Sequence, residues 1–181
     1  MKKRVLFIQG GGEGGYEAGI PLAEALQEAV GEDYKVNYPR MESDEEAPDF
    51  GWLRQIGEEI SSSGENVIVV AHSLGASMVL KYLSEQLVAK SIAGIFLLAA
   101  PFWSGNEHWK QGLKLKEDFA AALPKNIRIF FYRCRDDDEV PVDHFAAYRD
   151  RLPGASFREP ESGGHLFKGS LHLLVRDIKA L

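Results

Sequence analysis

The amino-acid sequence predicts an α/β fold, a three-layer sandwich in which helices cover both faces of a mostly parallel sheet of about six strands. The first observation behind this prediction is that short β-branched and aromatic runs alternate with longer helix-like segments along the whole chain. The second is that several of the short runs, such as VIVVA and IFLLAA, are apolar at consecutive positions. Consecutive apolar positions are typical of parallel strands that are covered on both faces.

The expected strands are short runs of β-branched and aromatic residues, which fit a pleated and buried surface. In chain order they are Val5–Gln9, Lys35–Tyr38, Val67–Ala71, Gly94–Ala99, Ile127–Arg133 and Ser156–Glu159. We expect right-handed crossovers between them, because a connecting helix packs back on a parallel sheet in that hand.

The expected helices lie between these strands and after the last one. In the first of them, apolar residues such as Leu22, Leu26 and Val30 recur at helical spacing. In chain order the helices are Glu17–Val30, Asp49–Ser62, Leu74–Val88, Lys110–Leu123, Val142–Leu152 and Leu171–Ala180.

Length and composition indicate one globular domain over residues 1–181, in which a short connection at about 101–124 joins the fourth and fifth expected strands. Cys134 is the single cysteine, so the sequence offers no disulfide framework and no cysteine cluster for zinc. A net charge of −6 and the lack of a dense Lys/Arg stretch argue against nucleic acid as a partner.

The N-terminal segment begins with basic residues, as a secretion signal does. The apolar run that follows, Val5–Ile8, is too short for the core of such a signal. No stretch approaches the roughly 20 apolar residues of a membrane span. We therefore expect a cytoplasmic protein without a membrane span.

A glycine-rich loop follows the first expected strand. Gly10, Gly12 and Gly15 match the dinucleotide-binding spacing G-x-G-x-x-G. That function also needs an acidic residue after the second strand, where this chain has Arg40. No Gly-Lys-Ser/Thr follows the glycines either, so a P-loop that binds nucleotide phosphates is disfavoured. These residues accordingly disfavour a nucleotide-dependent oxidoreductase as the alternative.

The third expected strand leads directly into a serine. In VIVVAHSLGASM, Ser73 lies between the strand and a helix that begins near Leu74. Ala71 and Gly75, two residues to either side, are small enough for the backbone to fold sharply there. An ordinary helix-capping serine would explain the junction, but it would not explain the small residues on both flanks.

These residues resemble the G-x-S-x-G nucleophile elbow of the α/β-hydrolase superfamily, with Ala71 in place of the first glycine. The resemblance extends over nearly the whole chain. Its compact size is similar to that of the small, nearly lidless serine hydrolases, including the retinoblastoma-binding serine hydrolase family. The resemblance implies a minimal α/β-hydrolase fold and a Ser, acid, His triad on successive loops, with Ser73 as nucleophile.

The resemblance also implies the acid and the base. Superfamily members often carry an acid, two further residues and Val-Pro after this strand, and Asp137 fits that pattern. Its neighbours Asp136 and Asp138 remain alternatives, and so does an acidic loop that only faces water. His165 follows two glycines after the sixth strand, where the superfamily places its catalytic histidine.

In hydrolases of this kind, backbone N–H groups of the first loop and of the residue after the nucleophile form the oxyanion hole. The resemblance therefore implies that Gly11, with Gly12 as an alternative, and Leu74 are the donors. Many superfamily members have His-Gly where this chain has Gln9-Gly10. On this interpretation the dinucleotide-like spacing of the loop is a coincidence.

Several residues are candidates for the substrate pocket. Aromatic side chains in the short connection can line it, and the alternative is that they only pack a helix onto the sheet. The candidates are Gly12, Tyr16, Phe102, Trp103, Trp109 and Phe167, together with Leu74.

The function that we expect is hydrolysis of small or medium carboxylic esters through an acyl-enzyme. Thioesters and amides are alternative substrates for the same groups. No metal and no organic cofactor is implied. The expected partner is a small-molecule ester as substrate, and the protein is expected to be a monomer or a small homo-oligomer. The alternative function is a non-catalytic binding or scaffold protein on a hydrolase fold.

Overall fold

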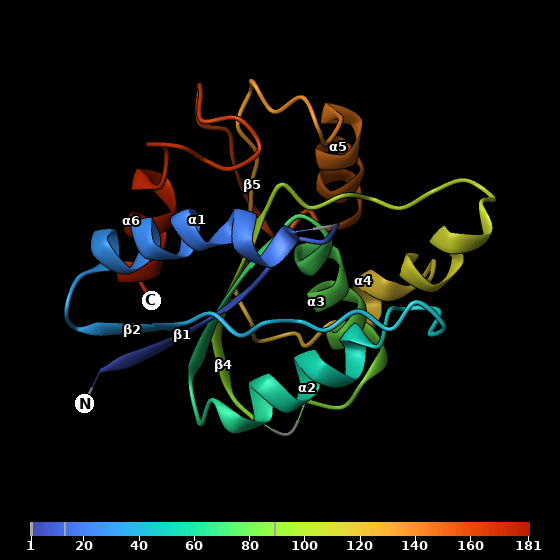
Figure 1. Ribbon diagram of the computed structural model, residues 1–181, viewed down its shortest axis with the longest axis horizontal. Helices are drawn as coiled ribbons and strands as arrows, with labels where there is room; N and C mark the ends of the chain where they lie inside the picture. The colour runs from blue at the N-terminus through green and yellow to red at the C-terminus, as the bar shows by residue number, and fades with distance from the viewer. Residues whose placement is uncertain (1, 13, 89) are drawn as a thin grey trace.

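The computed structural model describes residues 2–12, 14–88 and 90–181. Its sheet has six strands in the order β2-β1-β3-β4-β5-β6, and every neighbouring pair is parallel (Figure 1). The strands are β1 Lys3–Ile8, β2 Tyr34–Asn37, β3 Val67–His72, β4 Ile92–Leu98, β5 Ile129–Tyr132 and β6 Ser156–Arg158. The prediction of an α/β fold with six strands is confirmed, and the sheet is entirely parallel rather than mostly so.

Helices cover both faces of the sheet. Figure 1 shows α1 and α6 on one side and α2 and α3 on the other. The helices are α1 Gly15–Val30, α2 Trp52–Ser62, α3 Leu74–Glu85, α4 Phe119–Ala122, α5 Val142–Arg151 and α6 His172–Lys179, with a 3₁₀ helix η1 at His108–Leu113. Among the described residues, none of these helices is both long and apolar enough to cross a membrane.

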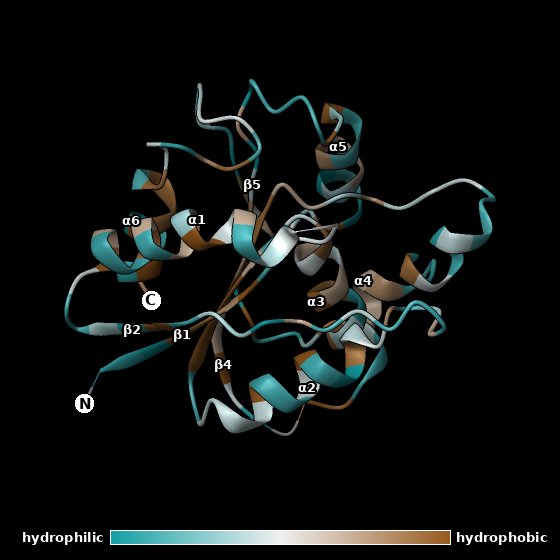
Figure 2. Ribbon diagram, in the orientation of Figure 1, coloured by the Kyte–Doolittle hydropathy of each residue, from teal (hydrophilic) through white to brown (hydrophobic). Residues whose placement is uncertain are grey.

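Alternation along the strands divides the apolar side chains into two cores. On β1, Val5 and Phe7 belong to the core beneath α1 and α6, whereas Leu6 and Ile8 belong to the core beneath α2 and α3. Side chains of successive strand residues point to opposite faces, so one continuous apolar run supplies both cores. Figure 2 accordingly shows β4 in hydrophobic colours, the beginning of β1 in hydrophilic ones, and α1 and α2 with hydrophobic and hydrophilic residues in alternation.

The connection between β4 and β5 differs from the prediction. One helix was expected over Lys110–Leu123, but η1 ends at Leu113 and α4 begins at Phe119. The segment between them is extended, and the carbonyl oxygen of Lys114 accepts a hydrogen bond from the ammonium of Lys81 at 2.7 Å. A single helix therefore does not span this connection, and Lys114, between the two short helices, contacts α3 through Lys81.

Parallel pairing brings all six carboxyl ends of the strands to one edge of the sheet. The loops that leave this edge after β1, β3 and β5 begin at Gln9, Ser73 and Arg133. The loop after β6 carries the fourth group, His165. The fold therefore collects the four predicted site loops at the same edge.

Candidate active site

Ser73 lies on a sharp turn between β3 and α3. Its backbone angles are φ 50° and ψ −122°, in a region that side chains other than glycine rarely adopt. Its N–H donates to the Leu98 carbonyl at 2.8 Å, which ties the turn to the neighbouring strand. A strained residue held in this way is typical of a nucleophile elbow, which lifts the hydroxyl above the edge of the sheet.

The small residues around Ser73 are explained by close backbone contacts. A Cβ on Gly75 would lie 2.2 Å from the carbonyl oxygen of Gln9, so any side chain there would displace β1 or α3. Ala71 is fully buried within β3, between Ile8 of β1 and Leu97 of β4. The sheet accommodates its methyl group, so the departure from the G-x-S-x-G pattern does not distort the turn.

The glycine loop after β1 packs against the elbow. A Cβ on Gly11 would lie only 2.4 Å from Cδ2 of Leu74, so the two predicted oxyanion donors belong to segments in direct contact. Leu74 is the first residue of α3, where the N–H has no partner within the helix. Gly12, the alternative donor, has φ 91° and open space where a Cβ would be.

Gln9 holds this loop from inside the protein. Its side-chain oxygen accepts a hydrogen bond from the Met41 N–H at 2.7 Å, and its amide nitrogen donates to the Gly10 carbonyl at 3.2 Å. Gln9 is buried. The residue that replaces the superfamily's histidine therefore connects the glycine loop to the segment after β2.

His165 and Asp137 form a buried pair. Nδ1 of His165 lies 3.2 Å from each carboxylate oxygen of Asp137. Oδ1 of Asp137 also accepts the N–H groups of Glu139 at 2.9 Å and Val140 at 3.1 Å. Burial raises the pKa of the Asp137 carboxyl, but the hydrogen bonds from His165, Val140 and Glu139 outweigh it and hold the pKa below its usual value.

The two neighbouring aspartates have other positions. Asp136 accepts the N–H groups of Gly163 at 3.1 Å and Gly164 at 2.9 Å, and these bonds, that of Gly164 first, lower its pKa. It thus holds the loop that carries His165. Asp138 is exposed. Of the three candidates, Asp137 is the one whose carboxylate contacts the imidazole.

His72 connects the elbow to the His165 loop. Its Nε2 lies 2.9 Å from the backbone oxygen of His165, and the two imidazole rings are 4.6 Å apart between centroids. Because a carbonyl only accepts, Nε2 of His72 must carry the proton. Burial, followed by the proximity of His165, lowers the pKa of His72 to about 4, so it is neutral near pH 7.

The stability of the protein is expected to fall on mild acidification because of His72. An unfolded chain protonates this histidine at its ordinary pKa of 6.5, whereas the folded protein resists protonation down to about 4. The unfolded state therefore binds more protons in this window, and stability present above it is lost as the pH falls. We expect a loss of about 2 kcal/mol between about pH 7 and about pH 5 from this group.

Urea unfolding of the wild type and of His72→Gln at both pH values measures this effect. The variant is expected to have a lower stability near neutral pH but a smaller loss between the two values. An equal loss in both proteins would show that His72 is not held neutral by the fold.

The loop that carries His165 contacts the elbow that carries Ser73, although no hydrogen bond joins Ser73 Oγ to the imidazole within the described part of the chain. His165 is fixed to His72, the residue directly before Ser73. Free hydrolases often have looser contacts that tighten when substrate binds. The assignment of Ser73, Asp137 and His165 as a triad stays a prediction.

Two of the aromatic candidates lie in the connection after β4, against α3 and each other. Trp103 donates from Nε1 to Ser77 Oγ at 2.9 Å, and its ring meets Trp109 edge to face with centroids 5.6 Å apart. Trp109 is 53% exposed, which is high for a residue of its size. Phe102 packs edge-on against Tyr148 instead. Trp109 thus keeps apolar surface exposed, whereas Trp103 and Phe102 are both half-buried against the core beneath α2 and α3.

The other two aromatic candidates have packing partners. Tyr16 stacks on Tyr38 at 4.9 Å, with the Arg40 guanidinium over its outer face at 4.3 Å. Phe167 is only 2% exposed and belongs to the core beneath α1 and α6. Its φ of 53° turns the chain just after His165, so its evident contribution is to anchor that loop. A role of either residue in the pocket stays a prediction.

Cys134 is fully buried, and burial raises the pKa of its thiol to about 12. A thiol in this state is a poor nucleophile at neutral pH. Within residues 2–12, 14–88 and 90–181, no group of three or more His, Cys, Asp or Glu side chains is arranged to hold a metal ion.

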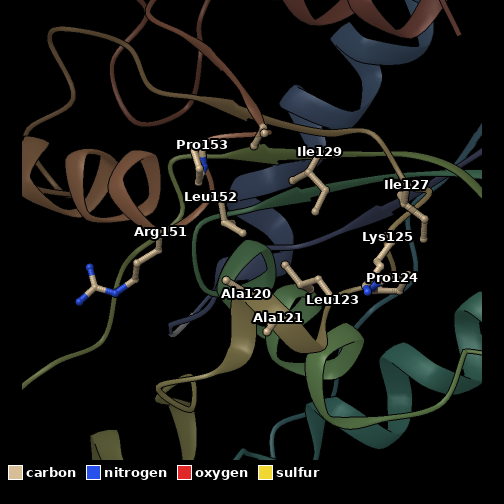
Figure 3. A pocket seen from close by; sticks show the side chains of 12 residues that line it. Ala120, Ala121, Leu123, Pro124, Lys125, Ile127, Ile129, Arg151, Leu152 and Pro153 are labelled. Atoms are coloured by element: carbon tan, nitrogen blue, oxygen red, sulfur yellow. The ribbon is translucent and has the colours of Figure 1, made fainter.

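Cavities occur at both edges of the sheet. One of about 450 Å³ lies beside His165 and includes Glu139 and Lys168 in its wall. Another of about 360 Å³, shown in Figure 3, is lined by Ile127 and Ile129 at the beginning of β5. The cavity of Figure 3 therefore lies at the amino-terminal edge, away from the loops that carry Ser73 and His165.

Sequence reasoning missed the contributions of His72, Asp136 and Glu139. The sequence assigned no site role to His72, and its hydrogen bond to the backbone of His165 is a structural contact. Asp136 was considered only as a rival acid. The acidic loop and the position next to Ser73 were visible in the sequence, but their partners are distant along the chain.

Comparison with known proteins agrees with this architecture. A family model described as serine hydrolase matches residues 24–173. A search of curated proteins finds no match to the sequence.

Three solved structures illustrate the likeness of fold. The ydeN gene product from B. subtilis is 18% identical with a TM-score of 0.71, over 99% of this chain and 98% of that one. SOBER1 from Arabidopsis thaliana is 14% identical with a TM-score of 0.68, over 99% of both chains. Est1E from Butyrivibrio proteoclasticus is 15% identical with a TM-score of 0.67, over 99% of this chain and 86% of that one. The sheet of this protein is that of an α/β hydrolase.

Proposed function

Because the chain belongs to the serine hydrolase family, whose model matches residues 24–173, we propose that it cleaves carboxylic esters through an acyl-enzyme on Ser73. The observation that carries this proposal is the fixed pair of His165 and Asp137, together with the hydrogen bond from His72, the residue directly before a strained serine, to the His165 carbonyl. A serine hydroxyl is a weak nucleophile by itself and needs such a base.

In the proposed reaction, Ser73 Oγ attacks the ester carbonyl carbon while Nε2 of His165 takes its proton. Asp137 holds Nδ1–H and stabilises the imidazolium that forms. The imidazolium then gives its proton to the leaving alcohol oxygen as the C–O bond breaks. Water enters by the same proton route and releases the acid, which restores Ser73.

The negative charge on the carbonyl oxygen needs donors that are in place before the reaction. We propose the N–H groups of Gly11 and Leu74 for this role, because their segments pack against each other beside Ser73. One such donor typically stabilises the transition state by about 2.7–4 kcal/mol. The tight approach of Leu74 explains why residue 11 carries no side chain.

The acyl or alcohol part of the substrate needs apolar contacts near this site. We propose Trp103 and Trp109, in a cap-like connection over residues 101–124, because both retain accessible ring surface. The hydrogen bond from Trp103 to Ser77, which lies one turn into α3, places the ring of Trp103 next to the helix that Ser73 precedes.

A fluorophosphonate probe followed by peptide mapping tests the proposal. The probe is expected to modify Ser73, and the unmodified protein is expected to hydrolyse short-chain p-nitrophenyl esters. A matched series of thioesters and amides then ranks the alternative substrates. Labelling elsewhere, or no labelling together with no turnover of any ester, would favour the non-catalytic binding protein instead.

A further inference from the structure

Glu139 is the charged group nearest to the catalytic face of His165. Its Oε2 lies 3.5 Å from Nε2, the nitrogen that does not face Asp137. Glu139 is placed there by its own N–H, which donates to Asp137 Oδ1. The same aspartate thus orients the imidazole and sets the position of the second carboxylate.

Nε2 of His165 is free to meet a ligand. The side chain is 8% exposed, and Nε2 makes no hydrogen bond within the part of the chain that the structure describes. Every fully buried side-chain nitrogen or oxygen in that part has a partner, so Nε2, which has none, keeps some exposed surface, and His165 forms part of the wall of a cavity. This cavity of about 450 Å³ is the one that His165 lines.

The wall of this cavity is mainly acidic. Its charged groups besides His165 are the carboxylates of Asp136, Asp138 and Glu139 and the ammonium of Lys168. Asp136 already accepts two backbone N–H groups. Glu139 is 66% exposed at its side chain, so its charge is available to a molecule in the cavity.

The proton-transfer step fixes which part of a substrate comes here. The leaving oxygen must approach Nε2 to within about 3 Å to receive its proton. With Oε2 of Glu139 3.5 Å from the same nitrogen, that oxygen lies no more than about 6.5 Å from the carboxylate. The alcohol part of an ester therefore meets the charge of Glu139, whereas the acyl part stays on Ser73.

Building on the proposed function, we propose that Glu139 is a specificity-determining residue that favours esters with a cationic alcohol part and disfavours those with an anionic one. An exposed ion pair changes an equilibrium by about two- to fivefold. Attraction of one substrate and repulsion of the other combine, so we expect a preference of about tenfold for the cationic ester in kcat/KM.

Three esters of the same acid test this inference, namely butyrylcholine, its uncharged analogue 3,3-dimethylbutyl butyrate, and 2-sulfoethyl butyrate. They are compared in the wild type, in Glu139→Gln and in Glu24→Gln. Glu24 is exposed on α1, so its substitution changes the net charge equally without touching the site. Ser73→Ala is included with each ester.

We expect the cationic preference to fall at least about threefold in Glu139→Gln, to persist in Glu24→Gln, and to weaken in about 0.5 M NaCl. The neutral ester is the reference in each protein, so a general effect of the substitution on the imidazole cancels in the ratio of cationic to neutral kcat/KM. Equal rates for the three esters, no turnover of butyrylcholine by a protein that the fluorophosphonate labels, or a preference unchanged in Glu139→Gln would overturn the inference and leave the proposed function intact. Turnover that survives Ser73→Ala would instead overturn the proposed function, and this inference with it.

Discussion

Ser73→Ala is expected to lower kcat/KM for ester hydrolysis by at least about a thousandfold and to abolish fluorophosphonate labelling. The substitution keeps the Cβ of residue 73 but removes Oγ, the atom that would form the bond to the acyl group. Ala occupies the same backbone region as Ser, so the unfolding midpoint is expected to stay near that of the wild type.

Ser84→Ala is the matched control for this experiment. Ser84 lies on α3, the helix that Ser73 precedes, and its hydroxyl donates to the Lys81 carbonyl at 3.0 Å. Its loss is expected to leave both labelling and turnover unchanged. Full labelling of Ser73→Ala would show that another side chain is the nucleophile.

Asp137→Asn is expected to lower kcat by about a hundredfold to ten-thousandfold with little change in KM. The amide oxygen can still accept the N–H groups of Glu139 and Val140, so the amide nitrogen is left facing His165. A donor at that place requires Nδ1 to accept, which moves the ring proton to Nε2. A protonated Nε2 cannot take the proton of Ser73.

Asp136→Asn and Asp138→Asn are the controls that separate the three aspartates. The Asp136 carboxylate accepts the N–H groups of Gly163 and Gly164, so its substitution is expected to lower the stability of the protein. The expected decrease in kcat is less than about tenfold. Asp138→Asn is expected to have the least effect. A larger loss of kcat in Asp136→Asn than in Asp137→Asn would assign the acid differently.

The strands were predictable because local composition decides them. Continuous apolar runs such as Val67–Ala71 fit only a strand covered on both faces, and β3 begins at Val67 as expected. In place of the helix expected over Lys110–Leu123 the structure has η1 and α4, and the segment between them contacts Lys81 of α3 through the Lys114 carbonyl. A single sequence does not reveal such a contact between elements.

Some features of the candidate site could likewise be predicted from the sequence, and others could not. The positions of Ser73, Asp137 and His165 after successive strands followed from the order of elements and from a family pattern. The family pattern favoured Asp137 but left Asp136 and Asp138 open, and in the folded chain it is the Asp137 carboxylate that contacts the imidazole. The bond from His72 to His165 spans 93 residues, and only the folded chain brings the two together.

The unusual backbone conformation of residue 73 also limits how far the stability of the protein can be increased, by evolution or by engineering, without loss of activity. Holding a residue other than glycine in such a conformation costs about 1–3 kcal/mol, and contacts such as that between Gly75 and the Gln9 carbonyl sustain it. A glycine at position 73 would relieve that cost and remove the hydroxyl at once. Selection for thermal stability alone would therefore favour variants that have lost the nucleophile and are inactive. Directed evolution of this protein has to screen for turnover in the same round.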